Sequence, residues 1–467
     1  MAAQHHADRE ASTIAAIATP PGPGGIGIIR ISGSEARPIL GRIFRPSRDR
    51  ELLSHRLTYG WIVDPASGQT LDEVMAVLMA APHSYTREDV VEIQSHSSYL
   101  ILQQLLGLVL KVGAIPAEPG EFTKRAFLNG RLDLTRAEAV IDLLQAQTSQ
   151  GLQIAVSLLR GSLQERVEAV RQQLLSVRAL LEVAIDFPDD DLEIINPTLL
   201  LPNLADQVIA PLEELLRAAD RGRIYREGIS VVILGRPNVG KSSLLNSLLK
   251  EERAIVTEIP GTTRDTIEDF LNIKGMPVRI VDTAGIRENA EAVEELGIQR
   301  ARRKQEGADL VLLVVDGADG VQADDLALLG SLAGRPALLV VNKIDLCPAR
   351  QLEEFSTAAP GLPVVAVSAR TGAGLAELEA AIFATVTGST EAAEPEHYCV
   401  PNVRHRQALQ GALVSAGQLV AALENGLPPD LAAIEVQAAL EQLGEIVGET
   451  TSEDLLDAIF SRFCLGK

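Results

Sequence analysis

Gly235-Arg-Pro-Asn-Val-Gly-Lys-Ser242 is the stretch that decides the fold. It follows the apolar run 229–234, which has the composition of a buried strand, and it leads into the helical pattern of residues 243–249. A strand, a glycine-bounded loop and a helix in this order predict a phosphate-binding P-loop. Gly235 and Gly240 allow successive N–H groups to turn toward phosphate oxygens, and the positive end of the helix dipole adds to the attraction.

The next motifs offer ligands for Mg²⁺ and contacts to the γ-phosphate. Lys241 can reach the β- and γ-phosphates, and the Ser242 hydroxyl can ligate Mg²⁺. Thr263, in Gly261-Thr-Thr-Arg-Asp265, is the expected second Mg²⁺ ligand and one of the expected GTP-binding residues. Asp282-Thr-Ala-Gly285 ends a short strand pattern, where the aspartate can hold Mg²⁺ through water and the glycine N–H can contact the γ-phosphate.

Two later motifs predict selection of guanine. The apolar run 337–341 ends in Asn342-Lys-Ile-Asp345, and a carboxylate at Asp345 can accept hydrogen bonds from guanine N1–H and the N2 amino group. Adenine lacks this donor pair, and unpaired buried polar groups can cost a factor of roughly 10⁴–10⁵. The sequence therefore predicts a GTPase domain, whose expected GTP-binding residues are Gly235, Asn238, Val239, Gly240, Lys241, Ser242, Ser243, Asp282, Thr283, Ala284, Gly285, Asn342, Lys343, Asp345, Ser368, Ala369 and Arg370.

The residue after Gly285 distinguishes this domain from the common small GTPases. They place a glutamine there to orient the attacking water, whereas this chain has Ile286. Either hydrolysis is slow or another group takes this role. The carboxylate-rich segment 287–297 offers glutamates, and the alternative is that these side chains form a solvated helix start.

Composition sets the broad class. The 467 residues predict about two to four domains, and 46% hydrophobic with 22% charged residues is typical of soluble globular proteins. No apolar run approaches the roughly 18 residues of a membrane span, and residues 1–10 lack the apolar core of a signal peptide. Three cysteines cannot build a disulfide framework. We therefore expect a cytoplasmic protein. The net charge of −21 argues against broad non-specific nucleic-acid binding, but not against an RNA held by a local patch or a basic partner.

Residues 1–129 predict an α+β domain. Its strand-like runs 13–17 and 27–31 flank the glycine-rich segment 20–25. Gly22, Gly24 and Gly27 satisfy G-x-G-x-x-G, but the dinucleotide fingerprint must open a helix and a β-rich run follows here. We therefore interpret the segment as a loop.

Helical periodicity marks residues 130–222 and 389–467, on either side of the GTPase domain at 223–388. A stripe at steps of four and three predicts one long helix of ordinary bundle core, ended before a break at Pro197 and Pro202; its members are Leu163, Val167, Val170, Leu174, Val177 and Leu181. Thr451-Ser-Glu-Asp454 predicts the start of the last helix. The predicted fold class is multidomain α/β: an α+β N-terminal domain, a discontinuous helical bundle and an inserted Ras-like P-loop GTPase domain.

Several motifs outside the GTPase domain carry a family resemblance. They are Thr19-Pro-Pro-Gly with Gly27-Ile-Ile-Arg-Ile-Ser-Gly33, Pro119-Gly-Glu-Phe with Arg125-Ala-Phe-Leu-Asn129, and the terminal Phe463-Cys-Leu-Gly-Lys467. Together with the GTPase motifs, they resemble the MnmE (TrmE) family of tRNA-modification GTPases. The resemblance implies a homodimer with a folate-binding, dimerising N-terminal domain. It also implies an FAD-containing partner, MnmG (GidA), with which the chain would form a heterotetramer or larger complex. The implied reaction adds an aminomethyl-type group to C5 of the wobble uridine of certain tRNAs. The implied one-carbon donor is 5-formyl- or 5,10-methylene-tetrahydrofolate.

The resemblance further implies a K⁺ site and a catalytic residue. Asn238 matches a K⁺ ligand of the family, and Thr257, Ile259 and Thr262 fall in the loop that completes the ion's shell, with Thr257 and Thr262 also among the GTP-binding residues. In the family, K⁺ acts roughly where other GTPases place an arginine finger, and its ordering brings two GTPase domains together. The family's catalytic glutamate falls at Glu294, which addresses Ile286.

The folate-binding positions of the family fall at Arg30, Glu92, Arg131 and Lys467. The family has lysine at Arg131, so the charge is kept while the geometry differs. His96-Ser97-Ser98 stands where the family usually has His-Gly-Gly, and the added Cβ atoms are expected to narrow the folate pocket.

The terminal cysteine has two open readings. From its position, Cys464 is either a loose surface thiol or a nucleophile, and Gly466 excludes a prenylation box. It matches the family's essential C-terminal cysteine, for which covalent attack on the uridine ring and a purely positional role both stay open.

A second function class is a regulatory or ribosome-assembly GTPase that only switches conformation. Such a factor would be expected to carry an RNA-binding appendage, such as a GXXG loop with basic flanks. The folate-like N-terminal domain and Cys464 favour the enzyme. The basic run Arg300-Ala-Arg-Arg-Lys304 can contact RNA or form one solvated helix face.

Overall fold

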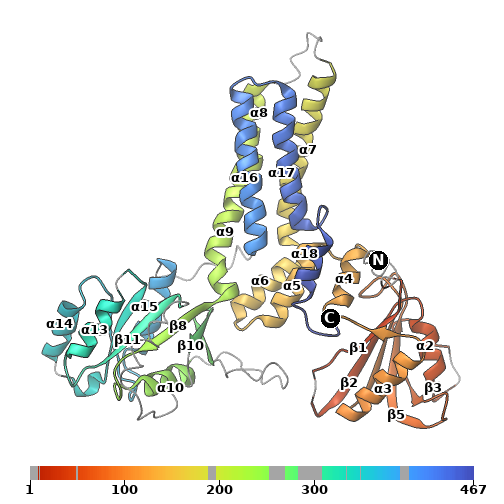
Figure 1. The fold of residues 1–467 in the computed structure, drawn as a ribbon, viewed down its shortest axis with the longest axis horizontal. Helices are drawn as coiled ribbons and strands as arrows, with labels where there is room; N and C mark the ends of the chain where they lie inside the picture. The colour runs from red at the N-terminus through yellow and green to blue at the C-terminus, as the bar shows by residue number, and fades with distance from the viewer. Residues whose placement is uncertain are drawn as a thin grey trace.

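The computed structural model describes residues 9, 11–20, 22–48, 51–187, 196–251, 269–281, 308–332, 334–347, 349–389 and 399–467. Figure 1 shows an upright helical bundle with one sheet domain on either side of its lower end. The first sheet domain comes from the N-terminal part of the chain. The second is inserted between two helices of the bundle, which is the arrangement that the sequence predicts.

The N-terminal domain is a seven-stranded sheet in the order β3-β4-β5-β6-β2-β1-β7, antiparallel except for the pair β1–β7. Helices α2 and α3 cover one face, where Leu40 and Leu105 share a core with Ile31 and Ile93. The glycine-rich run opens into a strand and not into a helix, which confirms that it is not a dinucleotide fingerprint. The elements are β1 (Ile14–Ile17), β2 (Gly24–Ser32), α2 (Ala36–Ile43), β3 (Phe44–Pro46), β4 (Thr58–Val63), β5 (Thr70–Met79), β6 (Val90–Ser97), α3 (Tyr99–Lys111) and β7 (Ile115–Pro116).

The bundle is made by helices from both sides of the insertion. Helix α16 packs on α17 and α9, and α17 packs on α7. Every member of the predicted apolar stripe on α7 is buried, because a four-three repeat places these side chains on one helix face. The elements are α4 (Glu121–Leu128), α5 (Leu134–Gln145), α6 (Ser149–Arg160), α7 (Ser162–Asp186), α8 (Pro197–Leu204), the π-helical turn η1 (Ala205–Ile209), α9 (Ala210–Glu227), α16 (Val403–Glu424), α17 (Pro429–Val447) and α18 (Glu453–Phe460).

Two helix boundaries differ from the prediction. Pro197 begins α8, but Pro202 lies inside this helix and does not end it. The proline lacks an N–H donor, and the chain absorbs the disturbance in the π-helical turn η1. The last helix is capped by Ser452 and not by Thr451, because the Ser452 side chain accepts the hydrogen bond from Leu455 N.

The inserted domain is a six-stranded sheet in the order β13-β12-β11-β8-β10-β9, parallel except for β9. Its central strands β8, β11 and β12 are almost entirely apolar because helices cover both faces. The strand expected at residues 229–234 is confirmed. The elements are β8 (Ile229–Leu234), α10 (Lys241–Glu251), β9 (Asp269–Ile273), β10 (Met276–Val281), β11 (Leu310–Asp316), α13 (Ala323–Ser331), β12 (Ala337–Asn342), the 3₁₀ turn η2 (Ile344–Leu346), α14 (Ala349–Ala358), β13 (Val364–Ala366) and α15 (Leu375–Thr387).

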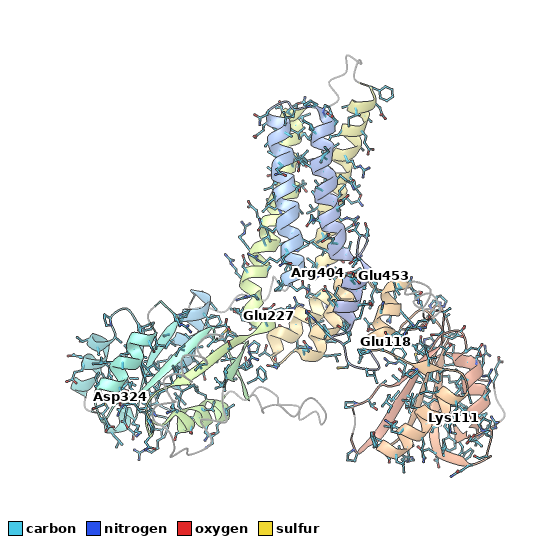
Figure 2. All side chains as sticks on the ribbon, viewed as in Figure 1. Lys111, Glu118, Glu227, Asp324, Arg404 and Glu453 are labelled. Atoms are coloured by element: carbon cyan, nitrogen blue, oxygen red, sulfur yellow. The ribbon has the colours of Figure 1, made fainter. Side chains whose placement is uncertain are left out.

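Buried and partly buried charged residues lie where the chain passes between the bundle and the inserted domain. Arg404, in the first turn of α16, donates to both oxygens of Glu138 on α5, at 3.0 and 2.8 Å. The fully buried His405 ring places Nε2 2.7 Å from the same carboxylate. In the last turn of α9, Arg226 pairs with Asp142 of α5 at 2.6 Å. We call these five residues the α5 clamp; Figure 2 labels Arg404 and the neighbouring Glu227 at the lower end of the bundle.

Within the described part of the chain, no helix combines the length and the apolar character needed to cross a membrane.

Replacing Glu138 by Ala should lower the free energy of unfolding by about 3–5 kcal/mol, because Arg404 would be left buried without its counter-charge. Urea unfolding followed by circular dichroism measures this loss. The matched control is Glu182→Ala on α7, which breaks the exposed Arg178–Glu182 pair and should cost about 0.5 kcal/mol or less. Equal effects of the two substitutions would contradict a stabilising role for the clamp.

Candidate functional site

The loop between β8 and α10 has the backbone that the P-loop motif requires. The φ angles of Gly235, Asn238 and Gly240 are +147°, +63° and +94°. A Cβ atom on Gly235 would lie 2.2 Å from Val314 O, and one on Gly240 would lie 2.3 Å from Asn342 Nδ2. Glycine is therefore needed at both ends of the loop for its conformation and for lack of space.

Lys241 lies over this loop. Its Nζ donates to Gly235 O at 2.9 Å and to Arg236 O at 2.7 Å. Burial lowers the pKa of the Lys241 ammonium, because the charged form is partly removed from water. A phosphate group approaching the loop would therefore meet a desolvated cation, and an anion compensates such a charge well. Ser242 and Ser243 follow in the first turn of α10.

Asn342 joins the phosphate-binding loop to the base-binding loop. This side chain at the end of β12 is buried; its Nδ2 donates to Val239 O at 2.9 Å and its Oδ1 accepts from Ala369 N at 3.1 Å. Both bonds connect segments that are far apart in sequence. The structure thus brings together the residues expected at the two ends of the nucleotide.

Asp345 is the expected guanine-binding carboxylate. Its Oδ1 accepts from the Ser368 hydroxyl at 2.6 Å, and its Oδ2 accepts from Arg370 Nη2 at 2.5 Å. The Ser368 hydrogen bond, together with the charge of Arg370, holds the pKa of Asp345 below its usual range. The carboxylate is therefore ionised at neutral pH and can accept from the N1–H and N2 groups of guanine.

Lys343 makes a further link that the motif did not predict. Its backbone φ is +63°, and its Nζ donates to Asn238 O at 2.9 Å and to Asp316 Oδ2 at 2.5 Å. Asp316 ends β11, so this lysine fixes the P-loop asparagine against a neighbouring strand end.

Arg236 is a functional candidate that sequence reasoning missed. Its Nε donates at 2.9 Å to Asp325, a buried carboxylate in the first turn of α13 that also accepts from Gln322 N. This ion pair joins the P-loop to α13, the helix that follows β11. Only the acidic helix start 322–325 gave a local signal, and nothing in it pointed to Arg236.

Part of the predicted site lies outside the described residues: the γ-phosphate motif Asp282, Thr283, Ala284 and Gly285, the second Mg²⁺ ligand Thr263, the K⁺ loop residues Thr257, Ile259 and Thr262, and Glu294. Strand β10 ends at Val281, directly before that γ-phosphate motif in the sequence. The basic run at 300–304 lies outside the described residues as well.

A second group of predicted residues gathers on the N-terminal domain. Arg30 on β2 donates from Nε to Glu92 Oε1 on β6 at 2.9 Å, and from Nη1 to Gly466 O at 3.0 Å. The carbonyl of Lys467 accepts from Phe122 N at 3.2 Å. The chain's last residues thus lie against two positions that are distant in sequence, where the resemblance places folate contacts.

The tail that carries Cys464 is held by its backbone and by its neighbours. Gly466 has φ +88°, and a Cβ atom there would lie 2.6 Å from Ile17 O. Phe463 is buried between α4, α5 and α18, in a cluster with Leu134 and Phe460. Cys464 itself is exposed. The arrangement presents a thiol at the surface on a fixed backbone.

Arg131 has different neighbours. Its guanidinium lies 4.7 Å from the Tyr85 ring centroid and donates to Tyr85 O at 2.9 Å. It also lines a cavity of about 580 Å³ together with Arg136 and Arg171, between the end of α4 and the helices α7 and α17. No contact joins Arg131 to Arg30 or Glu92 among the described residues.

The segment 96–98 has defined contacts. Ser97 Oγ donates to Gly22 O at 3.0 Å, so this side chain faces the glycine-rich loop. His96 Nδ1 lies 2.8 Å from Asp72 Oδ1, and that hydrogen bond raises the pKa of His96. The serine therefore fills space beside Gly24 that a glycine would leave open.

The sheet is parallel except for β9, has a P-loop after β8, and carries after β12 the carboxylate that is expected to bind guanine. This arrangement is that of a P-loop GTPase. Here its domain is inserted into a helical bundle. A family model for the "MnmE helical domain" matches residues 134–464, and one for the "GTP-binding protein TrmE N-terminus" matches residues 13–131. The chain belongs to the MnmE (TrmE) family, and it is a GTP-hydrolysing enzyme.

Full-length relatives agree with this assignment. The "tRNA modification GTPase MnmE" of Desulfotalea psychrophila is 53% identical over 99% of both chains, and that of Moorella thermoacetica is 47% identical over 97% of this chain and 99% of its own. Among solved structures, the G domain of the T. maritima FeoB iron transporter is 29% identical over 34% of this chain and 98% of its own, with a TM-score of 0.26. Aquifex aeolicus Era bound to GDP·AlF₄⁻ is 29% identical over 40% of this chain and 66% of its own, with a TM-score of 0.27.

Replacing Asp345 by Asn should weaken GTP binding by about 10³-fold or more, because the carboxylate that accepts from guanine N1–H and N2 is lost. The same variant should gain affinity for xanthosine triphosphate, whose C2 carbonyl accepts from the new amide. Titration with fluorescent nucleotides measures both changes. Asp319→Asn removes another carboxylate of this domain, 3.9 Å from Arg236, and should leave the preference for GTP intact. An Asp345→Asn protein that still prefers GTP would refute the assignment.

Proposed function

We propose that this chain is a K⁺-dependent GTPase that, with an FAD-containing partner of the MnmG type, modifies C5 of the wobble uridine in certain tRNAs. The observation that carries this proposal is the contact of the C-terminal tail with the Arg30–Glu92 pair. A GTPase that only switches conformation has no need of a surface thiol on a tail whose Gly466 carbonyl accepts a hydrogen bond from Arg30, the partner of Glu92. The full-length relatives named as tRNA modification GTPases support the same function.

The residues beside the tail fit a folate. The Arg30 and Glu92 side chains are each about four-fifths buried and offer a donor fork and a carboxylate side by side. A pterin ring presents donors and acceptors on one edge, which this pair can bind. Arg30, Glu92 and Lys467 would hold the folate, and when bound it would supply a one-carbon unit. Arg131 belongs to this site only if the folate extends along α4, or if a second copy of the chain contributes it.

The GTPase site fits the two cations through oxygen ligands. Ser242 and Thr263 would hold Mg²⁺, and Asn238 with Thr257, Ile259 and Thr262 would hold K⁺. The φ of +63° at Asn238 and the hydrogen bond that its carbonyl accepts from Lys343 support this proposal, because they set the direction of the loop. Glu294 would position the attacking water in place of the glutamine of small GTPases. Closure and reopening of two such domains in a homodimer would then regulate the modification reaction, in the cytoplasm where tRNA is available.

GTP hydrolysis should be at least about tenfold faster in KCl than in NaCl at equal ionic strength, because K⁺ would stabilise charge that develops between the β- and γ-phosphates. Steady-state phosphate release measures the two rates. Asn238→Ala should abolish the difference and keep GTP binding within about threefold, since the backbone contacts of the loop remain. Equal rates for the unaltered protein in both salts would remove K⁺ from the proposal and leave a generic GTPase.

Replacing Cys464 by Ser should reduce tRNA modification by at least about tenfold and leave GTP hydrolysis unchanged, because a hydroxyl is a far weaker nucleophile than a thiolate. Mass spectrometry of digested tRNA, with the FAD protein present, measures the modified uridine. Cys347→Ser is the matched control, since it removes a thiol of the GTPase domain and should keep modification. Full modification by the Cys464→Ser protein would show that the thiol is dispensable. It would also refute a chemical role of the tail in the modification.

A further inference from the structure

The tip of the β9–β10 hairpin touches the helical bundle. Lys274 and Gly275 form the two-residue turn between the strands, with φ angles of +49° and +85°. Two successive residues with positive φ are typical of a type I′ turn, whose twist matches that of the paired strands. Gly275 N donates to Asn272 Oδ1 at 2.9 Å, which closes the turn on itself. The hairpin therefore presents a rigid tip to its neighbour.

That neighbour is Gln150, the second residue of α6. A Cβ atom built on Gly275 would lie 1.4 Å from Gln150 Oε1 and 2.3 Å from its Cδ, so the side-chain amide lies directly on the glycine Cα. Gln150 Oε1 is buried and has no hydrogen-bond partner among the described residues. Such a contact is a Cα–H···O interaction at most. A buried amide oxygen without a conventional partner is uncommon, so its position here calls for an explanation.

Other contacts fix the hairpin from two more sides. Lys274 Nζ lies 5.2 Å from the ring centroid of Phe383 on α15. That ring packs against Tyr225 of α9, with centroids 6.5 Å apart. At the α9–β8 joint, a Cβ atom on Gly228 would lie 2.4 Å from Pro277 O of β10. The hairpin is thus held between the bundle and the last helix of the GTPase domain, and Figure 1 shows β10 beside the lower ends of α9 and α6.

The two strands of the hairpin lead toward the nucleotide. Strand β9 begins at Asp269, shortly after Thr263 in the sequence, and β10 ends at Val281, directly before Asp282. Both segments are expected to face the Mg²⁺ ion and the γ-phosphate. The pair is joined by antiparallel hydrogen bonds along its length, so a shift at its tip moves both strand ends together.

We propose that Gln150 is a positioning residue for GTP hydrolysis: it holds the tip of the β9–β10 hairpin and thereby fixes where β9 begins, at Asp269, and where β10 ends, at Val281. The inference rests on the proposed roles of Thr263 and Asp282, and it does not depend on folate, K⁺ or the partner protein.

Gln150→Ala should lower kcat for GTP hydrolysis by about tenfold, because small misplacements far from the chemistry reduce the rate. KM and the dissociation constant for GTP should stay within about twofold, since the P-loop and Asp345 lie on other strands. Steady-state hydrolysis and nucleotide titration on the full-length protein measure this split. Gln150→Asn keeps the amide on a shorter side chain, so its kcat should lie between those of the unaltered protein and Gln150→Ala. It serves as the second variant if Gln150→Ala does not fold.

Gly275→Ala tests the contact from the other side. It should lower kcat at least as much as Gln150→Ala, because the new methyl group would overlap the amide. Gly361→Ala is the matched control: Gly361 has the same φ of +85°, and nothing lies within 4 Å of its Cβ position, so it carries the backbone strain without the overlap. This control should keep kcat within about twofold of the unaltered protein.

The double variant Gln150→Ala/Gly275→Ala decides the matter. If the two residues act through their contact, removing the amide relieves the overlap, and the double variant should hydrolyse GTP faster than Gly275→Ala alone. Losses in kcat that multiply would overturn the proposal, as would a Gln150→Ala protein with unaltered kcat. A protein that fails to modify tRNA but shows the predicted kcat pattern would refute the proposed function and leave this inference standing.

Discussion

The α5 clamp is the constraint on which the arrangement of the domains depends. Burial alone would raise the pKa of Glu138, but His405 and Arg404 outweigh it and hold the pKa of this carboxyl far below its usual range. Burial lowers the pKa of His405, and the charge of Glu138 opposes this shift. Arg404 also donates to Glu445 O and Ile446 O at the end of α17. The ion pair of Glu138 and Arg404 therefore joins α5, α16 and α17. Replacing a single member leaves an uncompensated charge in the interior.

This clamp gives the GTPase domain a fixed base. The chain enters that domain from α9, whose last turn carries Arg226, and returns to the bundle at α16, whose first turn carries Arg404. Since both passages are paired with carboxylates of α5, the inserted sheet has two attachments to one helix. The P-loop and the base-binding loop are joined in turn by Asn342. The hairpin contact at Gln150 adds a third attachment, next to the segments expected to surround the γ-phosphate.

Local patterns predicted what local chemistry determines. The P-loop, the guanine motif and the α7 stripe were all predictable, because backbone conformation and helix periodicity are encoded within a few residues. The long-range pairs were not. Glu138 and Arg404 are 266 positions apart, and Arg236 and Asp325 are 89 apart, and neither pair has a periodic or spacing signal. Arg131 shows the limit of transfer by position: the resemblance grouped it with Arg30, but in one chain its contacts lie with Tyr85, because α4 separates the two sites.

The tail and the GTPase domain are attached to consecutive helices of the chain. Gly120 N, at the start of α4, donates to Cys464 O, and Lys124 on the same helix pairs with Asp457 of α18 at 2.6 Å. Helix α4 leads through residues 129–133 into α5, and α5 carries both carboxylates of the clamp. The exposed thiol is therefore connected to both attachments of the GTPase domain through two short helices, with no long loop between them. The tail and the two attachments of the GTPase domain are therefore carried by neighbouring helices, and this follows from the order of the elements whatever the reaction at Cys464.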